Sequence, residues 1–166
     1  MEFRNVGFSG LRVSVAGLGC NNFGMRLDQE KTQAVVDKAI DLGVTLFDTA
    51  DVYGGGQSEV MLGKALGDRR QDVIVATKFG SPMGEGPYKA GGSRRYIMAA
   101  CEASLKRLGT DYIDLYQIHR PDASTPLEET MRALEDLVRS GKVRYIGHSN
   151  FAGWQAAEAH AVAKYE

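Results

Sequence analysis

Short apolar runs alternate with longer amphipathic stretches along almost the whole chain. Most of these runs are rich in Val, Ile, Leu, Ala or Phe, and each has the length of a buried strand. The runs recur about every 30 residues, with one longer interval, and about 30 residues is what a strand, a helix and two short loops occupy in a βαβ unit. The runs that we predict as parallel strands span residues 15–19, 44–47, 73–77, 113–118 and 143–147.

A stretch with apolar residues at helical spacing follows each predicted strand. Asp28 and Ser93 precede two of these stretches and are predicted N-caps. Residues 125–128, with the sequence Thr-Pro-Leu-Glu, have the form of a capping box and predict the start of another helix. Glycine favours the backbone conformation found just after a helix. The glycines predicted to end helices are Gly43, Gly67, Gly109 and Gly141.

The packed faces of the last two helices follow from the same spacing. In the helix after residue 126, the face predicted to line the core carries Met131, Leu134 and Val138. The last helix is expected to pack through its tryptophan. The residues that it places on that side are Trp154, Ala157, Ala161 and Tyr165.

The order of the predicted elements indicates a barrel. Two short runs joined by a Ser9-Gly10 turn predict a β-hairpin over residues 3–15. Five strand–helix alternations without a linker predict one α/β domain over residues 1–166, of the (β/α)8 TIM-barrel type. Such a barrel typically needs about 250 residues. We therefore expect a barrel truncated after about five βα units, over about residues 15–166, with uncovered edges that allow self-association.

Composition and charge exclude several classes of protein. The net charge of −1 and the pI near 6.3 predict neither a nucleic-acid partner nor a membrane surface. No apolar run approaches the ~18 residues of a membrane span, and the first residues lack the apolar core of a secretory signal. Cys20 and Cys101 form no CxxC pair and no metal-ligand spacing. This predicts a cytoplasmic protein without a metal site.

Residues that could bind a ligand or take part in catalysis stand at or just after the carboxyl end of each predicted strand. Because the carboxyl ends of parallel strands lie on one side of a sheet, these residues are expected to converge on one face, where βα barrels place their active sites. The residues are Gly19, Asp48, Lys78, His119 and the pair Ser149-Asn150.

Four of the neighbouring residues suit carbonyl reduction. Asp48 paired with Lys78 would hold an ammonium near the phenol of Tyr53, which follows after a short loop. A phenol is a poor acid at neutral pH, and a neighbouring ammonium makes it a better one by favouring the phenolate. His119 could donate a hydrogen bond to a substrate oxygen. Each residue alone has an ordinary structural explanation, so the prediction depends on their joint occurrence.

Several motifs carry a resemblance to a known family. They are FDTA at residues 47–50, YG at 53–54, SE at 58–59, ATK at 76–78, SLKRL at 104–108, IDLYQIH at 113–119 and IGHSN at 146–150. Through these motifs the chain resembles the aldo-keto reductases, which are NAD(P)H-dependent oxidoreductases built on a (β/α)8 barrel. The resemblance extends over essentially all 166 residues.

The resemblance implies a role for each of these residues. It implies that Tyr53 is the general acid that protonates the carbonyl oxygen of an aldehyde or ketone, and that Asp48, Lys78 and His119 complete a catalytic tetrad. NADPH is the implied cofactor, with NADH possible, and a small-molecule carbonyl compound is the implied substrate. The residues implied to bind the cofactor are Gly19, Cys20, Asn21, Asp48, Ser149 and Asn150.

Two other functions stay open on the sequence alone. The chain could belong to a non-catalytic regulatory subunit that binds cofactor, or it could be an inactive truncated fragment. A Rossmann site is rejected, because Gly17-Leu18-Gly19 begins like a dinucleotide fingerprint but Asn22 stands where the third glycine belongs.

Overall fold

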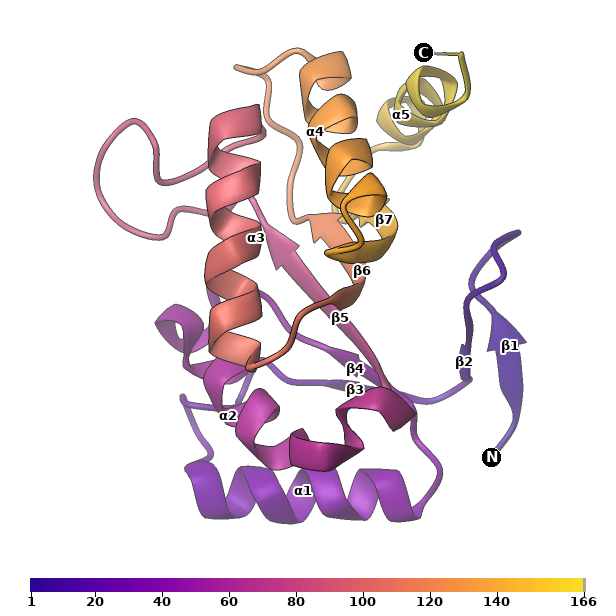
Figure 1. Ribbon diagram of the computed structural model, residues 1–166, viewed down its shortest axis with the longest axis vertical. Coiled ribbons are helices and arrows are strands. Elements are labelled where there is room, and N and C mark those ends of the chain that lie inside the picture. Colours follow the sequence, from indigo (N-terminus) through magenta and orange to yellow (C-terminus); the bar gives the residue numbers. More distant parts are fainter. Residues whose placement is uncertain (166) are drawn as a thin grey trace.

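The computed structural model describes residues 1–165 and begins with the predicted hairpin. β1 (Phe3–Asn5) pairs antiparallel with β2 (Arg12–Ser14). Ser14 ties this hairpin to the main sheet, because its amide donates to Thr45 Oγ1 at 3.0 Å and its Oγ accepts from the Thr45 amide at 2.8 Å. The hairpin therefore lies beside the amino ends of the sheet strands, away from their carboxyl ends (Figure 1).

The five predicted parallel strands form one sheet, which confirms the barrel-type α/β prediction. Each strand pairs in parallel with the next, so the order along the chain is also the order in space, as in the wall of a βα barrel. The first and last strands each have one sheet neighbour within residues 1–165. The strands are β3 (Gly17–Gly19), β4 (Leu46–Asp48), β5 (Ile74–Phe79), β6 (Ile113–Ile118) and β7 (Val143–His148).

β3 and β4 each begin two residues later than the sequence predicts. The amide of Val15 donates to Glu2 O at 3.0 Å, so Val15 extends the hairpin side of the chain. The amide of Val44 donates to Ala39 O at 2.9 Å, so Val44 closes the preceding helix. A backbone amide that is already paired cannot join the sheet ladder. Apolar composition alone could not separate these residues from the strands that follow them.

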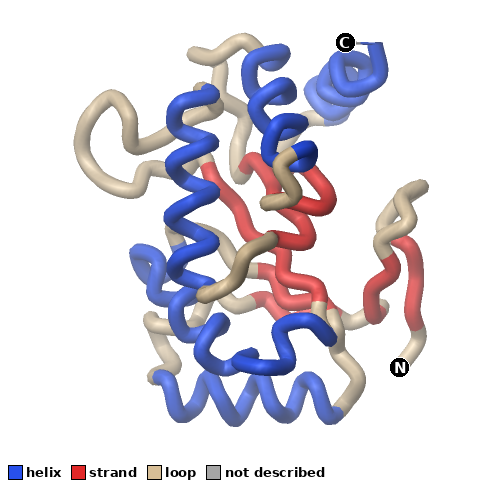
Figure 2. Tube along the Cα trace, viewed as in Figure 1, coloured by secondary structure: helices blue, strands red, loops and turns tan. Residues whose placement is uncertain are grey.

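The helices form an outer layer around the sheet. α1 to α4 cover its outer face, and α5 lies beside α4 (Figures 1 and 2). Two 3-10 segments, η1 (Tyr53–Gly56) and η2 (Gly67–Asp72), flank α2. The helices are α1 (Gln29–Asp41), α2 (Gln57–Leu66), α3 (Arg94–Leu108), α4 (Leu127–Arg139) and α5 (Gly153–Tyr165).

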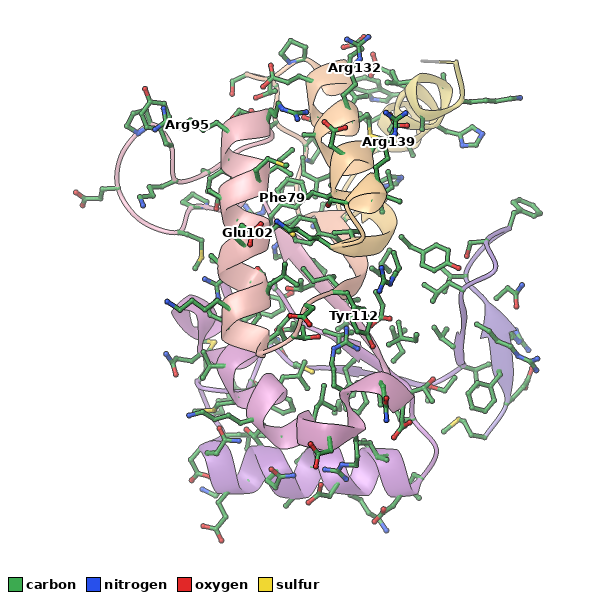
Figure 3. The ribbon with its side chains drawn as sticks, viewed as in Figure 1. Phe79, Arg95, Glu102, Tyr112, Arg132 and Arg139 are labelled. Atoms are coloured by element: carbon green, nitrogen blue, oxygen red, sulfur yellow. The ribbon has the colours of Figure 1, made fainter. Side chains whose placement is uncertain are left out.

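Apolar side chains fill the space between the sheet and the helices. Phe79 on β5 and Tyr116 on β6 are fully buried, and their ring centroids lie 4.8 Å apart. Figure 3 shows Phe79 between α3 and the sheet. Along β6, Tyr116 and Ile118 are buried, whereas the alternate residues Leu115 and Gln117 are half-buried. The inner face of the curved sheet is thus less covered than the outer face.

Two predicted helix caps are confirmed and one is wrong. Asp28 accepts from the Lys31 amide at 2.9 Å, and Ser93 Oγ accepts from the Tyr96 amide at 3.4 Å. The predicted capping box does not form: the N-cap of α4 is Pro126, without a side-chain cap bond. Thr125 Oγ1 instead donates to the Asp122 carboxylate at 2.8 Å. A charged acceptor nearby outcompetes the helix terminus for this hydroxyl.

The packed faces of α4 and α5 also differ from the prediction. On α4, Leu134 is buried and Met131 packs against the core as predicted, but Val138 is 37% exposed, and the fully buried Leu137 packs in its place. Trp154 is 68% exposed, so the expectation that it packs is wrong. α5 turns Ala159 inward, since small side chains let it approach α4. The side chain of Tyr165 lies outside the described part of the structure.

Gly63 marks a close approach of α2 to α3. A Cβ at this position would lie 2.2 Å from Leu108 O, far inside van der Waals contact. We expect Gly63→Ala to destabilise the protein by about 1–3 kcal/mol, although alanine favours a helix over glycine by about 1 kcal/mol. Urea-induced unfolding measures the change. Gly153→Ala is the control, because an added Cβ there meets nothing within 4 Å; equal or higher stability of Gly63→Ala would contradict the prediction.

Candidate active site

The carboxyl ends of β4, β5 and β6 bring together Asp48, Lys78 and His119. Asp48 is the last residue of β4, Lys78 is the penultimate residue of β5, and His119 directly follows β6. The sheet ladder continues to this point, since the His119 amide donates to Phe79 O at 2.8 Å. Parallel pairing thus places the three side chains at one edge of the sheet.

Lys78 and Asp48 form a hydrogen-bonded ion pair. Lys78 Nζ donates to both carboxylate oxygens of Asp48 at 2.7 Å and to Thr49 O at 2.9 Å. The Lys78 side chain is 7% exposed, whereas that of Asp48 is 42% exposed. Three acceptors hold the ammonium in one position, with its charge compensated by a carboxylate.

The Tyr53 ring lies close to both this ammonium and the His119 imidazole. Tyr53 opens η1, where Gly54 and Gly55 adopt φ values of 58° and 62°, so the chain turns back over the sheet edge in a conformation that favours glycine. Lys78 Nζ lies 5.3 Å from the centroid of the Tyr53 ring. The His119 ring meets it edge to face, with centroids 5.7 Å apart at 85°. The structure therefore brings together all four residues of the predicted tetrad.

His119 lies in a half-buried position that disfavours its charged form. Burial lowers its pKa, and the Lys78 and Arg120 charges lower it further, while Asp48 opposes them. The imidazole is therefore neutral at neutral pH, with one N–H donor and one acceptor nitrogen. Ser81 Oγ lies 3.4 Å from His119 Nδ1. A neutral imidazole can donate to a substrate oxygen without adding a charge to the site.

Ser149 and Asn150 lie at the carboxyl end of β7, next to His119. Asn150 Nδ2 donates to His119 O at 2.8 Å and to Ser149 Oγ at 3.1 Å. Asn150 has a φ of 59°, a left-handed conformation that asparagine tolerates better than most residues. The pair thus presents a hydroxyl and an amide, a donor set that can both donate to and accept from a carboxamide.

The three residues after β3 differ in what they can offer a ligand. Gly19 and Asn21 are exposed, and Gly19 lies level with Asp48 in the sheet. Cys20 has no exposed surface, and its carbonyl accepts from Ser58 Oγ at 2.7 Å. Burial and the Asp48 charge raise the pKa of the Cys20 thiol to about 12. A direct contact of Cys20 with a cofactor, as the resemblance implied, does not fit this structure.

A buried ion pair behind the Tyr53 loop was not among the predicted site residues. Glu59 has no exposed surface and accepts from Arg107 Nε and from Thr77 Oγ1, each at 2.6 Å. Asp51, which is 1% exposed, lies next to it. The partners come from α2, β5 and α3, and no spacing rule links residues so far apart in sequence.

Asp122 fastens together the two loops that border the site. Its carboxylate accepts from the amides of Gly92 at 2.7 Å and Ser124 at 2.9 Å, and from the Thr125 hydroxyl. Partial burial raises the pKa of Asp122, but hydrogen bonds from Ser124, Gly92 and Thr125 outweigh burial and bring it to about 2. Because this pKa is depressed, the carboxylate stabilises the fold above about pH 4, and that contribution is lost as the pH falls toward 2.

We expect Asp122→Asn to release the loop over residues 80–92. The variant loses the negative charge that accepts hydrogen bonds from Gly92, Ser124 and Thr125. Hydrogen bonds to a charged group contribute about 1.5–3 kcal/mol. Amide hydrogen exchange at Gly92 and Ser124 should therefore become about 10- to 100-fold faster. Exchange at Thr32, fully buried on α1, serves as the internal control. Unchanged protection at Gly92 would show that Asp122 does not hold the loop.

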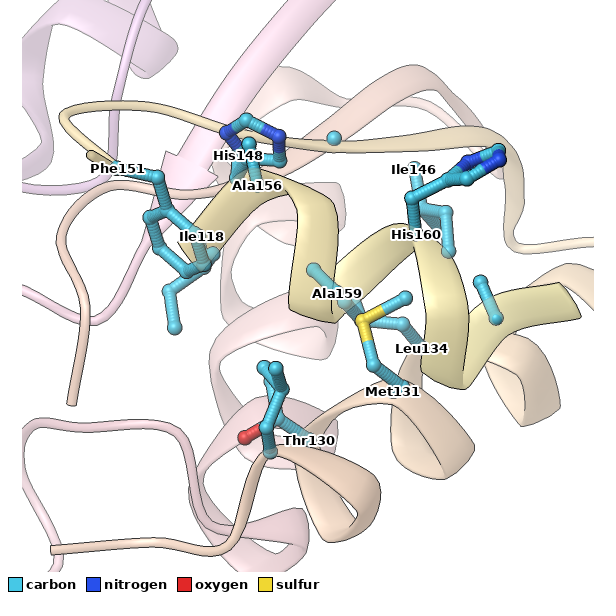
Figure 4. A pocket seen from close by; sticks show the side chains of 13 residues that line it. Ile118, Thr130, Met131, Leu134, Ile146, His148, Phe151, Ala156, Ala159 and His160 are labelled. Atoms are coloured by element: carbon cyan, nitrogen blue, oxygen red, sulfur yellow. The ribbon is translucent and has the colours of Figure 1, made fainter. Parts of the chain in front are cut away.

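An apolar cavity lies beside the site, under α5. It has a volume of about 180 Å³, and Figure 4 shows Ile118, Leu134 and Ile146 among its lining residues, with Ala159 reaching in from α5. His148 lines it too, and its ring stacks on that of Phe151 at 4.7 Å. Small alanines on α5 leave this space open, and its lining lacks the tetrad. It is a gap in helix packing next to the site.

Two further findings concern residues 1–165. None of the helices there is long and apolar enough to cross a membrane. That part of the chain also holds no group of three or more His, Cys, Asp or Glu side chains placed to bind a metal ion.

Comparison with known sequences gives consistent matches. The model of the aldo/keto reductase family matches residues 16–166. YrpG of Bacillus subtilis (strain 168), described as an uncharacterized oxidoreductase, is 45% identical over 99% of this chain and 54% of its own length. The L-glyceraldehyde 3-phosphate reductase of Escherichia coli (strain K12) is 43% identical over 92% of this chain and 46% of its own. A probable voltage-gated potassium channel subunit beta of Oryza sativa subsp. japonica is 42% identical over 98% of this chain and 51% of its own length.

A solved structure shows the same fold. The crystal structure of a thermostable aldo-keto reductase with the inhibitor epalrestat matches with a TM-score of 0.87 at 37% identity, covering 99% of this chain and 59% of that one. The chain spans about half the length of the curated relatives that it matches.

Proposed function

This chain belongs to the aldo/keto reductase family, and on that premise we propose that it carries the tetrad for NAD(P)H-dependent reduction of aldehydes or ketones to alcohols. One observation supports this most directly. The Asp48–Lys78 pair and the His119 ring both lie close to the Tyr53 ring, at the carboxyl ends of adjacent parallel strands.

Tyr53 is the proposed general acid. Its phenol gives a proton to the carbonyl oxygen as the carbonyl carbon gains a hydride, and the product is an alcohol. Lys78 stabilises the phenolate that remains, since its ammonium is held near the ring by Asp48. His119 donates a hydrogen bond to the same carbonyl oxygen and orients it toward Tyr53. Solvent then returns a proton to the phenolate.

The cofactor is proposed to bind along the same edge of the sheet. A bound dihydronicotinamide supplies the hydride. Ser149 and Asn150 are proposed to hold its carboxamide, because a hydroxyl and an amide satisfy both of its hydrogen-bonding halves. Gly19 and Asn21 follow β3, the strand at the other end of the sheet from β7, are exposed, and are proposed to line the cofactor, whereas Cys20 is buried. NADPH in preference to NADH stays a prediction from the family resemblance.

A chimera tests the proposed activity. The chain replaces the matching part of the Bacillus subtilis oxidoreductase, and because the match covers 99% of this chain, the tetrad of the chimera comes from this chain. We expect aldehyde-dependent oxidation of NADPH that saturates with aldehyde. Calorimetric titration with NADPH is the parallel measurement. The proposal would be overturned by a chimera that binds NADPH but does not oxidise it when any aldehyde or ketone is added.

A regulatory subunit is the second candidate function. It is favoured by the 42% identity to the probable potassium channel subunit beta of Oryza sativa. Such a subunit would bind NADPH without sustained turnover, so one equivalent of bound cofactor would be oxidised slowly and no steady state would follow. Steady-state turnover in the chimera would exclude this candidate. Calorimetric titration of the 166-residue chain alone with NADPH tests the third alternative. Binding would show that these five units hold cofactor, and absence of binding would favour an inactive fragment.

A further inference from the structure

A buried polar cluster lies directly behind the Tyr53 loop, between the sheet and helices α2 and α3. Glu59 on α2 and Arg107 on α3 satisfy each other at 2.6 Å. Three further groups interact there, which are Asp51 from the loop after β4, Tyr96 from α3 and Tyr116 from β6. Unlike Glu59, Asp51 forms no ion pair within residues 1–165.

Asp51 is enclosed by protein, yet its carboxyl group is not satisfied. The residue is 1% exposed, and neither Oδ1 nor Oδ2 accepts a hydrogen bond within residues 1–165. Its backbone is fixed, because its amide donates to Lys78 O at 3.0 Å. The backbone of the Tyr53 loop is thus tied to β5 at Asp51, and the carboxyl group lies inside the protein. A buried carboxylate without donors is strongly unfavourable, so the neutral acid is the stable form at low and moderate pH.

The groups that face Asp51 set the pH at which it changes charge. Burial, followed by the charge of the Glu59 carboxylate, raises the pKa of Asp51 to about 7. Arg107, the Val52 amide and the Tyr96 hydroxyl oppose these effects only in part. Asp51 is therefore neutral below about pH 7 and becomes charged above it, within the physiological range.

Tyr96 connects Asp51 with His119 through Ser81. The Tyr96 hydroxyl donates to Ser81 O at 3.3 Å, and Ser81 Oγ lies 3.4 Å from His119 Nδ1. Burial and then the Asp51 charge raise the pKa of the same Tyr96 hydroxyl, so it also interacts with Asp51. A phenol has one proton to donate, and a carboxylate is a stronger acceptor than a carbonyl. Ser81 and an ionised Asp51 therefore compete for one donor.

We propose that Asp51 is a positioning residue for His119, acting through Tyr96 and Ser81. While Asp51 is neutral, the Tyr96 hydroxyl holds Ser81, and Ser81 contacts Nδ1. When Asp51 loses its proton to solvent, the Tyr96 hydroxyl turns to the carboxylate and Ser81 is released. His119 then loses its contact with Ser81, and the orientation of its ring is less restricted. The consequence for turnover rests on the proposed function, in which His119 orients the substrate oxygen.

NMR spectroscopy of the 166-residue chain tests this positioning role of Asp51 without cofactor or substrate. The carboxyl carbon of Asp51 and the ring nitrogens of His119 are followed from acidic to alkaline pH. In the wild-type chain we expect a step in the His119 signals near the pH at which Asp51 titrates, separate from protonation of the ring. Asp51→Asn, which mimics the neutral acid, should remove that step. Tyr96→Phe should remove the step but leave the titration of Asp51 itself.

Two outcomes would contradict the positioning role of Asp51. Titration of Asp51 in the ordinary acidic range of a carboxyl group would overturn the proposal, and so would a His119 step that persists in Tyr96→Phe. If Asp51→Asn does not fold, Tyr96→Phe still decides, because it removes only a hydroxyl. In the chimera, kcat should fall above about pH 7 in the wild type and stay level in Asp51→Asn. Loss of carbonyl reduction with the His119 step intact would refute the proposed function and leave the positioning role standing.

Discussion

Tyr53→Phe is expected to lower carbonyl reduction in the chimera by about 10²-fold or more, with NADPH affinity nearly unchanged. Phenylalanine keeps the ring next to Lys78 and His119 but has no proton to give to the carbonyl oxygen. The ring contacts of 5.3 Å to Lys78 Nζ and 5.7 Å to His119 do not depend on the hydroxyl. The loss should appear in kcat, while calorimetry reports the cofactor affinity.

Tyr88→Phe is the matched control for this prediction. Tyr88 lies in the loop over residues 80–92, is 57% exposed and packs against Arg95, whose guanidinium lies 4.0 Å from its ring centroid. The control loses one phenol hydroxyl without touching the tetrad, and its kcat should stay within about 2-fold of wild type. Unchanged turnover in Tyr53→Phe would refute Tyr53 as the acid, whatever the control shows.

Arg107→Met is expected to destabilise the fold by about 3–5 kcal/mol, because it leaves the Glu59 carboxylate buried without its cation. Glu59 has no exposed surface, and within residues 1–165 the Thr77 hydroxyl is its other side-chain donor. Methionine keeps most of the arginine stem, so packing is largely preserved. Urea-induced unfolding measures the loss. Glu59→Gln added to Arg107→Met should restore part of it, since the unpaired charge is then gone.

Arg94→Met is the control for the ion pair. Arg94 bonds Asp136 at 2.6 Å, but its side chain is 49% exposed. Exposed pairs contribute at most about 1 kcal/mol, so this variant should unfold close to wild type. A similar loss in the two arginine variants would show that burial of Glu59 does not determine the effect.

The sequence predicted best those elements whose signals are local. β6 begins and ends at the predicted residues 113 and 118, because a buried strand between two turns has a composition that few other structures share. Asp28 and Ser93 cap their helices as predicted, since an N-cap bonds an amide only three residues away. Thr125 failed as a cap because Asp122, an acceptor outside the motif, binds its hydroxyl.

The candidate site was predictable where the backbone alone positions a residue. Asp48, Lys78 and His119 converge because parallel strands end on one side of the sheet. The depth of a residue below that edge was not predictable, and so Cys20 is buried where the resemblance implied a contact with cofactor. Asp51 was overlooked for the same reason: its burial depends on side chains from α2, α3 and β6.

The hydrogen bonds that Asp122 accepts from Gly92, Ser124 and Thr125 have a consequence for engineering. The loop over residues 80–92 is closed at its stem, where the Gly91 amide donates to Gly80 O at 3.0 Å and Asp122 holds Gly92. A second rung, from the Met83 amide to Lys89 O at 2.9 Å, closes it further out. Residues 84–88 therefore form an exposed segment between two fixed anchor points. Sequence libraries confined to that segment would vary an exposed surface while the stem of the loop and the tetrad stay in place.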